Sequence, residues 1–439
     1  MLGSASRCLT LFRRLSAAWW VIAAGLPVHI ALAVATDLSP DEAYYLCAAR
    51  HPQGVTQLVD HPPLLPWLLA LSDGLTFLPL ELRVRLWPIA SSFVLGALCV
   101  ALVRRRGGSS AACTTAAWLS TWSLLPMAGG FVATPDGPAL VAVATLLLWA
   151  GGEPFSRAPV AGATKRDRSP ARWRVALGVA LATGLGTLAK VVVIPVALTL
   201  TANTPRRSGV TNAAVFLALA LSAPLTLQSL GFQLAHAFSA PAETAWTVAD
   251  ALGAVAGAAL AQVLLWSPWI LWRGARALPH MPRPDRAVVG LLTVLCLASA
   301  VVRAVPPEPN WWAGAAIVVV VAAATTAPDL APSRRLAMLT TAVFPSVLVL
   351  AHTLHPFLPL PQRADPTARL HGWSHGTEPL EAPGIGPYGP AAERCVYRGQ
   401  CADIDKYFSR LNYQVTGSAQ RSEPPLNEHP GSRGMKSIE

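Results

Sequence analysis

Charged residues are scarce in this chain of 439 residues. Asp, Glu, Lys and Arg make up 13% of the sequence, against about 25% in soluble domains, whereas 53% of the residues are hydrophobic. Such a chain has too few polar residues to cover a water-soluble globule. Segments long enough to cross a hydrocarbon core of about 30 Å recur along residues 1–352. The composition therefore predicts an integral membrane protein.

Acidic residues are also fewer than basic ones, 23 against 34, which gives a formal net charge of +11. A nucleic-acid-binding protein would gather this charge in one contiguous patch. Here the basic clusters lie in every second connection between apolar segments, as expected of cytoplasmic loops. The charge therefore indicates membrane topology, and we expect no nucleic-acid partner.

This charge pattern predicts eleven spans in an all-α polytopic bundle, with the N-terminus in the cytoplasm and the tail outside. The spans cover residues 16–35, 83–103, 109–127, 137–151, 175–189, 191–203, 210–230, 249–271, 287–304, 311–327 and 336–353. A single tilted helix over 175–203 is an alternative to the two short spans there. It would move Arg206 and Arg207 outside and invert every later loop, so two helices meeting near Lys190 fit the charges better.

The polar segments divide the chain further. Residues 1–353 form the predicted transmembrane domain, with a long first outer loop at 36–82. Residues 354–413 contain no apolar span, and we expect a small periplasmic α/β appendage there, followed by a disordered tail at 414–439. Cys395 and Cys401 both fall outside the membrane, where an oxidising compartment permits a disulfide between them.

The first outer loop contains a predicted helix start. In Ser39-Pro40-Asp41-Glu42, Ser39 is the N-cap and Glu42 reaches back to the cap amide, which leaves the Asp41 carboxylate available as a base. Thr134-Pro135-Asp136 repeats the pattern. Acidic residues in first turns are also common partners of the helix dipole, so a structural role for either Asp stays open.

These motifs resemble the bacterial GT-C glycosyltransferases of the protein-mannosyltransferase-like group, which includes the lipid A aminoarabinose and galacturonic acid transferases. The resemblance covers most of the chain. Its pieces occur in the family's order, as Asp41-Glu42-Ala43-Tyr44-Tyr45 with Asp60-His61-Pro62-Pro63, then Arg83-Val84-Arg85-Leu86, Thr134-Pro135-Asp136, 184–190, Glu308-Pro309-Asn310-Trp311-Trp312 and 365–373.

The resemblance implies a GT-C fold in a bacterial inner membrane and transfer of a sugar from a polyprenyl-phosphate carrier. The acceptor would be a lipid A, a glycan or a protein on the periplasmic side, and the reaction a single inverting displacement. No nucleotide site is needed, and the sequence contains no glycine-rich phosphate loop.

The resemblance also implies site residues. Asp41 is the expected base or acceptor-orienting group, and Asp136 the second acidic group, which would bind sugar or acceptor hydroxyls near Asp41. Lys190 is the expected phosphate ligand, although a lysine at a helix end can also snorkel to the interface. Arg83 and Arg85 could alternatively pair with Glu81, and Trp311 could belong to an aromatic belt. The other expected substrate contacts are Glu42, Tyr44, Tyr45, His61, Arg83, Arg85, Asn310 and Trp311.

Some relatives hold a divalent metal between a carboxylate and a distant histidine, and Asp60 with His236 would be the corresponding pair here. The alternative is that Asp60 and His61 cap the helix that follows Pro62-Pro63. His61 also replaces a lysine of the aminoarabinose branch, so the resemblance does not decide whether that branch's substrate carries over.

Two other function classes stay open. A transporter or lipid flippase would explain many spans, but it predicts internal repeats, and the two halves of the chain share no acidic motif. A non-catalytic membrane scaffold would explain a tail that departs from the family pattern.

Overall fold

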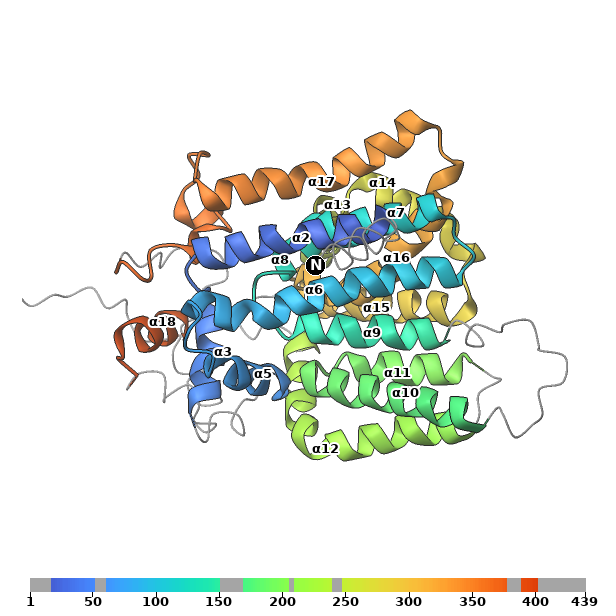
Figure 1. The fold of residues 1–439 in the computed structure, drawn as a ribbon, viewed down its shortest axis with the longest axis horizontal. Coiled ribbons are helices and arrows are strands. Elements are labelled where there is room, and N and C mark those ends of the chain that lie inside the picture. Colours follow the sequence, from blue (N-terminus) through green and yellow to red (C-terminus); the bar gives the residue numbers. More distant parts are fainter. Residues whose placement is uncertain are drawn as a thin grey trace, which may run out of the picture.

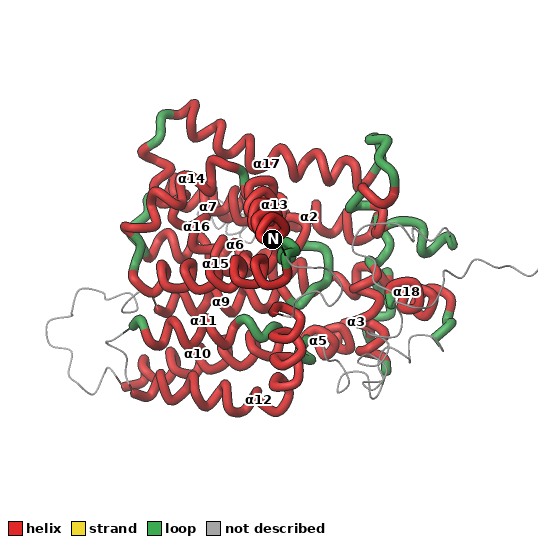
Figure 2. The backbone as a smooth tube through the Cα atoms, turned by 180° about the vertical axis from the view of Figure 1, so that it is seen from behind, coloured by secondary structure: helices red, strands yellow, loops and turns green. Residues whose placement is uncertain are grey.

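A computed structural model of the protein describes residues 17–51, 61–150, 169–204, 209–238, 247–376 and 388–401, without the side chains of residues 169–172 and 236. Every regular element in these residues is helical. Figure 1 shows most helices side by side in one bundle, with the smaller helices α3, α5 and α18 at one end, hereafter the loop end. Figure 2 shows the same arrangement from behind.

The apolar segments of the sequence form the helices of this bundle. Seven described helices are long and apolar enough to cross a membrane, and the other predicted spans are shorter helices, so the prediction of an all-α membrane bundle is confirmed. The bundle helices are α2 (Ala17–Ala35), α6 (Leu80–Arg105), α7 (Ser110–Trp122), α8 (Leu124–Gly129), α9 (Asp136–Ala150), α10 (Ser169–Ala189), α11 (Val193–Ala202), α12 (Gly209–Phe238), α13 (Val248–Trp266), α14 (Pro268–Ala277), α15 (Arg283–Arg303), α16 (Ala313–Thr326) and α17 (Pro332–Leu354).

The chain reverses direction at Lys190, as the charge pattern predicts. Helix α10 ends at Ala189 and α11 begins at Val193. At the end of the bundle away from the loop end, Arg283 at the start of α15 donates to the side chain of Asn203 just after α11, at 3.1 Å. Figure 1 shows α11 running back beside α10. The single tilted helix is therefore excluded.

Two predicted spans are interrupted. The span at 109–127 breaks at Ser123, where α7 ends at Trp122 and α8 begins at Leu124. The sequence predicts an unbroken helix at 249–271, whereas α13 ends at Trp266 and α14 starts at Pro268. Proline has no N–H and clashes with the carbonyl four residues earlier, so a helix rarely continues through it. Ser267 takes up the break with a φ of 70°, and its hydroxyl accepts from the amide of Trp269.

The loop end combines the first outer loop with the tail. Helices α3 (Pro40–Arg50) and α5 (Leu64–Asp73) pack with α18 (Gly389–Arg398) around a cluster that includes Tyr44, Leu65 and Ala392. Cys395 and Cys401 form a disulfide. The described part of the appendage contains short 3₁₀ helices and α18 but no strand, so the α/β expectation is not met there. The predicted disordered tail at 414–439 lies outside the described residues.

A buried ion pair fixes the start of α3. The capping box is present, with Glu42 accepting from the amide of Ser39 at 2.8 Å. The Glu42 carboxylate also accepts from Arg85 Nε at 2.9 Å and Nη2 at 2.8 Å, and from the amide of Ala133 at 2.8 Å. Both charged side chains are 0% exposed.

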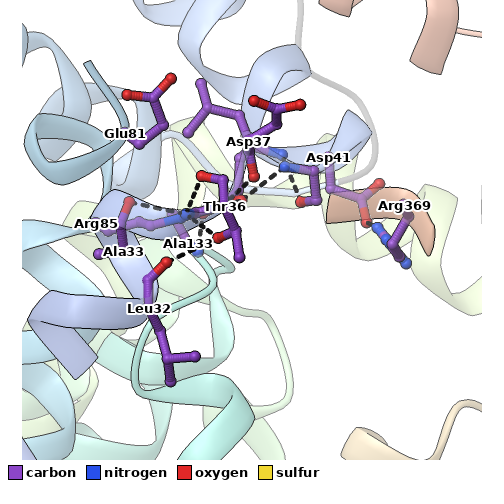
Figure 3. A network of polar contacts seen from close by, with 12 residues as sticks. Leu32, Ala33, Thr36, Asp37, Asp41, Glu81, Arg85, Ala133 and Arg369 are labelled. Atoms are coloured by element: carbon purple, nitrogen blue, oxygen red, sulfur yellow. Dashed lines mark hydrogen bonds and ion pairs between the residues drawn. The ribbon is translucent and has the colours of Figure 1, made fainter. Parts of the chain in front are cut away.

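Arg85 extends this contact to the end of α2. Its Nη1 donates to the carbonyls of Ala33 and Thr36 and to the Thr36 hydroxyl, and its Nη2 donates to the carbonyl of Asp37 (Figure 3). The pair therefore ties α2, α3, α6 and the segment before α9 together.

Glu393 is the second buried acid of the loop end. Its side chain lies in α18 at 1% exposure, and neither carboxyl oxygen has a hydrogen-bond partner among the described residues. Burial raises its pKa to about 10, with Glu42 and Asp37 adding to the shift and Arg85 and Arg369 opposing it. Docked α18 therefore holds Glu393 as a neutral acid at pH 7.

The Arg85→Gln substitution should destabilise the fold strongly, because it leaves the Glu42 carboxylate buried without its charged partner. We expect a loss of about 3–5 kcal/mol in the free energy of unfolding, measured by thermal or denaturant unfolding in detergent. The matched control is Arg50→Gln, since Arg50 pairs with Asp73 at the surface with 41% exposure, where a loss of about 0–1 kcal/mol is expected. Equal losses in the two variants would refute the structural role of Arg85.

Docking of α18 should weaken as pH rises. With α18 undocked, the pKa of Glu393 is the usual 4.5, and with α18 docked it is about 10. Below pH 4.5 Glu393 is protonated in both states, and between these two values it is ionised only when α18 is undocked, which favours undocking as pH rises. Cys47 lies beneath α18, with its thiol against the Ala392 carbonyl, so labelling of Cys47 by a maleimide, mapped by mass spectrometry, reports undocking. The ratio of Cys47 labelling in the unsubstituted protein to Cys47 labelling in Glu393→Gln, both taken at the same pH, should rise with pH. A constant ratio would contradict this account.

Candidate functional site

An apolar cavity lies inside the bundle at its loop end. Its volume is about 140 Å³, and its walls come from α9, α11, α12, α15 and α16. Most lining side chains are aliphatic, including Val143, Leu292 and Leu295. Asp136, Lys190, Gln233 and Asn310 supply most of its polar groups. These four residues lie at or near the loop-end termini of their helices, so the cavity has polar groups at that end and apolar walls deeper in the bundle.

Three of these polar residues form one cluster. Lys190 Nζ donates to Asp136 Oδ1 at 2.7 Å, and Asn310 Nδ2 donates to Asp136 Oδ2 at 2.9 Å. The Lys190 side chain is 8% exposed and the Asp136 side chain 18%. A buried ammonium requires an anionic partner, and Asp136 provides one here. The sequence identified all three residues as candidates, and the structure brings them together on the cavity wall.

Trp311 also lines the cavity, and its indole N–H donates to Glu308 at 3.3 Å. Trp311 belongs to the 3₁₀ helix η3 (Pro309–Trp312), which leads into α16. Trp311 thus lines the cavity at the start of an apolar span, a position that fits both a substrate contact and an aromatic belt.

A row of aromatic side chains connects the cavity to α3. His61 Nδ1 lies 3.5 Å from Gln233 Nε2, which lines the cavity, and the His61 ring centroid lies 6.1 Å from that of Tyr45. Tyr45 is followed by Tyr44 at 5.5 Å, and Tyr44 by Tyr388 of the tail at 4.8 Å. His61 therefore stands between the cavity and the tyrosines of α3.

Asp41 lies at the far end of this row, next to the tail. One carboxylate oxygen is paired with the guanidinium of Arg369, as Figure 3 shows, and the other accepts from the hydroxyl of Tyr388 at 2.5 Å. The Asp41 side chain is 30% exposed, so it is not part of the buried cap.

Sequence reasoning did not identify Arg369 and Tyr388 as site residues. Arg369 falls in the segment 365–373 that resembles the family pattern, but nothing in the sequence spacing indicates that Arg369 or Tyr388 contacts a residue more than 300 positions earlier.

The remaining predicted contacts have structural partners. Glu42 and Arg85 form the buried pair described above, away from the cavity lining. Arg83 donates to the carbonyl of Asp73 at 2.6 Å and to its carboxylate at 3.2 Å. Glu81, the alternative partner of the two arginines, accepts from the Tyr397 hydroxyl at 3.0 Å, and no ion pair joins it to Arg83 or Arg85 in the described part of the chain. These contacts give no support to a substrate-binding role for the three residues.

The predicted metal pair cannot be placed. Asp60 and the side chain of His236 lie outside the described residues. Within the part of the chain that the structure describes, no three His, Cys, Asp or Glu side chains converge as ligands of a metal ion.

Comparison with known proteins agrees with this architecture. Residues 60–231 match the family model of dolichyl-phosphate-mannose-protein mannosyltransferase. No curated protein matches the sequence.

Two solved structures share the fold. ArnT from Cupriavidus metallidurans in the apo state is 15% identical, with a TM-score of 0.54 over 95% of this chain and 79% of ArnT. The same protein bound to undecaprenyl phosphate is 16% identical, with a TM-score of 0.51 over 93% and 81% of the two chains. At such identity the likeness shows the fold alone. The family-model match covers residues 60–231, and the fold is shared with ArnT over most of the chain.

Proposed function

We propose that the protein transfers a sugar from a polyprenyl-phosphate carrier to a hydroxyl group of an envelope acceptor. The observation that carries this proposal is the apolar cavity with the Lys190 ammonium at its loop end. An isoprenoid chain is apolar along its length and anionic at one end, and the cavity has the complementary character. The undecaprenyl phosphate bound by the ArnT relative is a ligand of this chemistry.

In this proposal, Lys190 binds the phosphate of the carrier. Its hydrogen bond to Asp136 uses one of the three ammonium donors, and no other acceptor in the described part of the chain takes the remaining two, which can donate to a second anion. Developing negative charge on a departing phosphate is stabilised most by a cation already fixed in a site of low dielectric. Asp136 and Asn310 hold the ammonium in that position.

Asp41 acts on the acceptor. The acceptor oxygen forms a bond to the anomeric carbon while the bond from that carbon to the phosphate oxygen breaks. The electron pair leaves with the polyprenyl phosphate, and the acceptor proton passes to the Asp41 carboxylate. A single displacement of this kind inverts the anomeric configuration.

The chemistry takes place on the periplasmic side. Arg105, Arg106 and Arg283 belong to the end of the bundle opposite the loop end, and basic residues concentrate on the cytoplasmic side of bacterial membranes. The loop end then faces an oxidising compartment, where the disulfide between Cys395 and Cys401 is stable.

Asp41→Asn should abolish transfer, because the amide cannot accept the acceptor proton. A deletion strain complemented with this variant should show at least about a hundredfold less of the sugar-modified envelope component by mass spectrometry. The matched control is Asp250→Asn, which changes an exposed carboxylate at the start of α13 and should leave transfer intact. Normal modification by Asp41→Asn at equal expression would exclude Asp41 as the base.

Lys190→Met should weaken binding of undecaprenyl phosphate by about tenfold or more, measured by native mass spectrometry of the purified protein, because a charge-assisted contact is lost. The variant also leaves Asp136 unpaired, so the double variant Lys190→Met with Asp136→Asn removes both charges. If Lys190 binds phosphate, the double variant stays weak. Recovery of binding in the double variant would show that Lys190 serves only to neutralise Asp136.

A further inference from the structure

Two side chains of the tail, Arg369 and Tyr388, donate hydrogen bonds to the two oxygens of the Asp41 carboxylate. Arg369 comes from the 3₁₀ helix η6 (Ala368–Leu370), and Tyr388 directly precedes α18. The Tyr388 hydroxyl donates to Asp41 at 2.5 Å, and its ring packs against that of Tyr44 at a tilt of 46° and a centroid distance of 4.8 Å. For Asp41 to act as a base, the acceptor hydroxyl must donate a hydrogen bond to one of its carboxylate oxygens, as the Tyr388 hydroxyl does here.

The segment carrying Arg369 is held in place by its own contacts. Asp365 accepts from the amide and the hydroxyl of Thr367, both at 2.8 Å, and lies 3.2 Å from His352 of α17. Burial raises the pKa of Asp365, but the bonds from Thr367 and His352 outweigh it and hold that pKa below its usual value. After Arg369, the carbonyl of Leu370 accepts from the amide of Asp37 at 2.9 Å.

The helix that follows Tyr388 is anchored separately. Ala391 and Ala392 are buried against α3, at 3% and 0% exposure. At its other end Tyr397 accepts from the amide of Leu38 at 2.8 Å and donates to Glu81 at 3.0 Å. Because Tyr397 does not touch Asp41, α18 has an anchor independent of the contact made by Tyr388.

We propose that the Tyr388 hydroxyl occupies the position of the acceptor hydroxyl on Asp41, and that Arg369 is a positioning residue that holds the other oxygen of that carboxylate. This inference rests on the proposed function, in which Asp41 is the base. The acceptor must displace the phenol before it can react, so Tyr388 competes with the acceptor. Arg369 keeps Asp41 turned toward the displaced position, because a planar guanidinium restrains a carboxylate in one orientation.

The competition predicts a split between affinity and rate. Tyr388→Phe removes the competing hydroxyl and keeps the ring against Tyr44. The amount of acceptor needed for half-maximal rate should fall by about two- to tenfold, the value of one hydrogen bond, with the maximum rate little changed. Arg369→Gln should do the reverse and lower the maximum rate by about tenfold or more through misorientation of Asp41. Arg369→Lys, which keeps the charge without the planar fork, should recover part of that loss.

The experiment uses the purified full chain and membranes from a strain that lacks the protein, which supply both donor and acceptor. Transfer is followed by mass spectrometry as the amount of membranes is varied. Tyr397→Phe is the matched control, because it weakens the anchor of α18 and leaves the Tyr388 hydroxyl in place, so it measures the effect of loosening the helix alone. Thermal unfolding of each variant identifies any that fails to fold.

The outcomes separate this inference from the proposed function. Two results together support this inference. Tyr388→Phe, but not Tyr397→Phe, reaches half-maximal rate with a smaller amount of membranes, and Arg369→Gln has a lower maximum rate. If Asp41→Asn abolishes transfer while Tyr388→Phe and Arg369→Gln match the unsubstituted protein, this inference fails and the proposed function stands. A lower maximum rate for Tyr388→Phe would also overturn it, because the hydroxyl would then assist the reaction. If Asp41→Asn is fully active, both fail.

Discussion

The loop end of this protein depends on the buried ion pair between Arg85 and Glu42. Taking two charges out of water costs several kcal/mol each, and here the cost is offset by hydrogen bonds from all three guanidinium nitrogens and by two backbone amides on the carboxylate. Those bonds join segments that are distant in the chain. Asp41 precedes Glu42 in the same helical turn, so the pair also fixes where its carboxylate lies.

The fold separates two kinds of chemistry and then connects them. The membrane cavity has apolar walls and one ammonium, whereas Asp41 is partly exposed among polar groups of the tail. His61, Tyr45 and Tyr44 lie between them. A lipid-linked donor and a polar acceptor need such separate environments, because one is soluble in the bilayer and the other in water. The proposed reaction would occur where the two environments meet.

Much of the fold follows from the sequence, for physical reasons. Hydrocarbon thickness sets the length of the apolar runs, and the basic clusters indicate two helices meeting at Lys190. The capping box at Ser39 is local, so its spacing alone predicts it. The break at Ser267 was missed, although Pro268 is a signal that weighs against a continuous helix.

The partners of the charged residues could not be predicted in the same way. Arg85 pairs with Glu42 rather than with a phosphate, and Asp41 meets Arg369 and Tyr388, because tertiary packing sets these contacts over long separations in the chain. Asp136, Lys190 and Asn310 were each identified from motifs, yet their convergence on one cavity required the structure.

The central claim is that the cavity holds a polyprenyl phosphate with its anionic end at Lys190. A cryo-electron microscopy structure of the protein in lipid nanodiscs with undecaprenyl phosphate tests it most directly. We expect density for the isoprenoid chain between α9, α12 and α15, with phosphate oxygens within hydrogen-bonding distance, about 2.7–3.2 Å, of Lys190 Nζ. An occupied lipid site elsewhere, with the cavity filled only by protein side chains, would contradict the account.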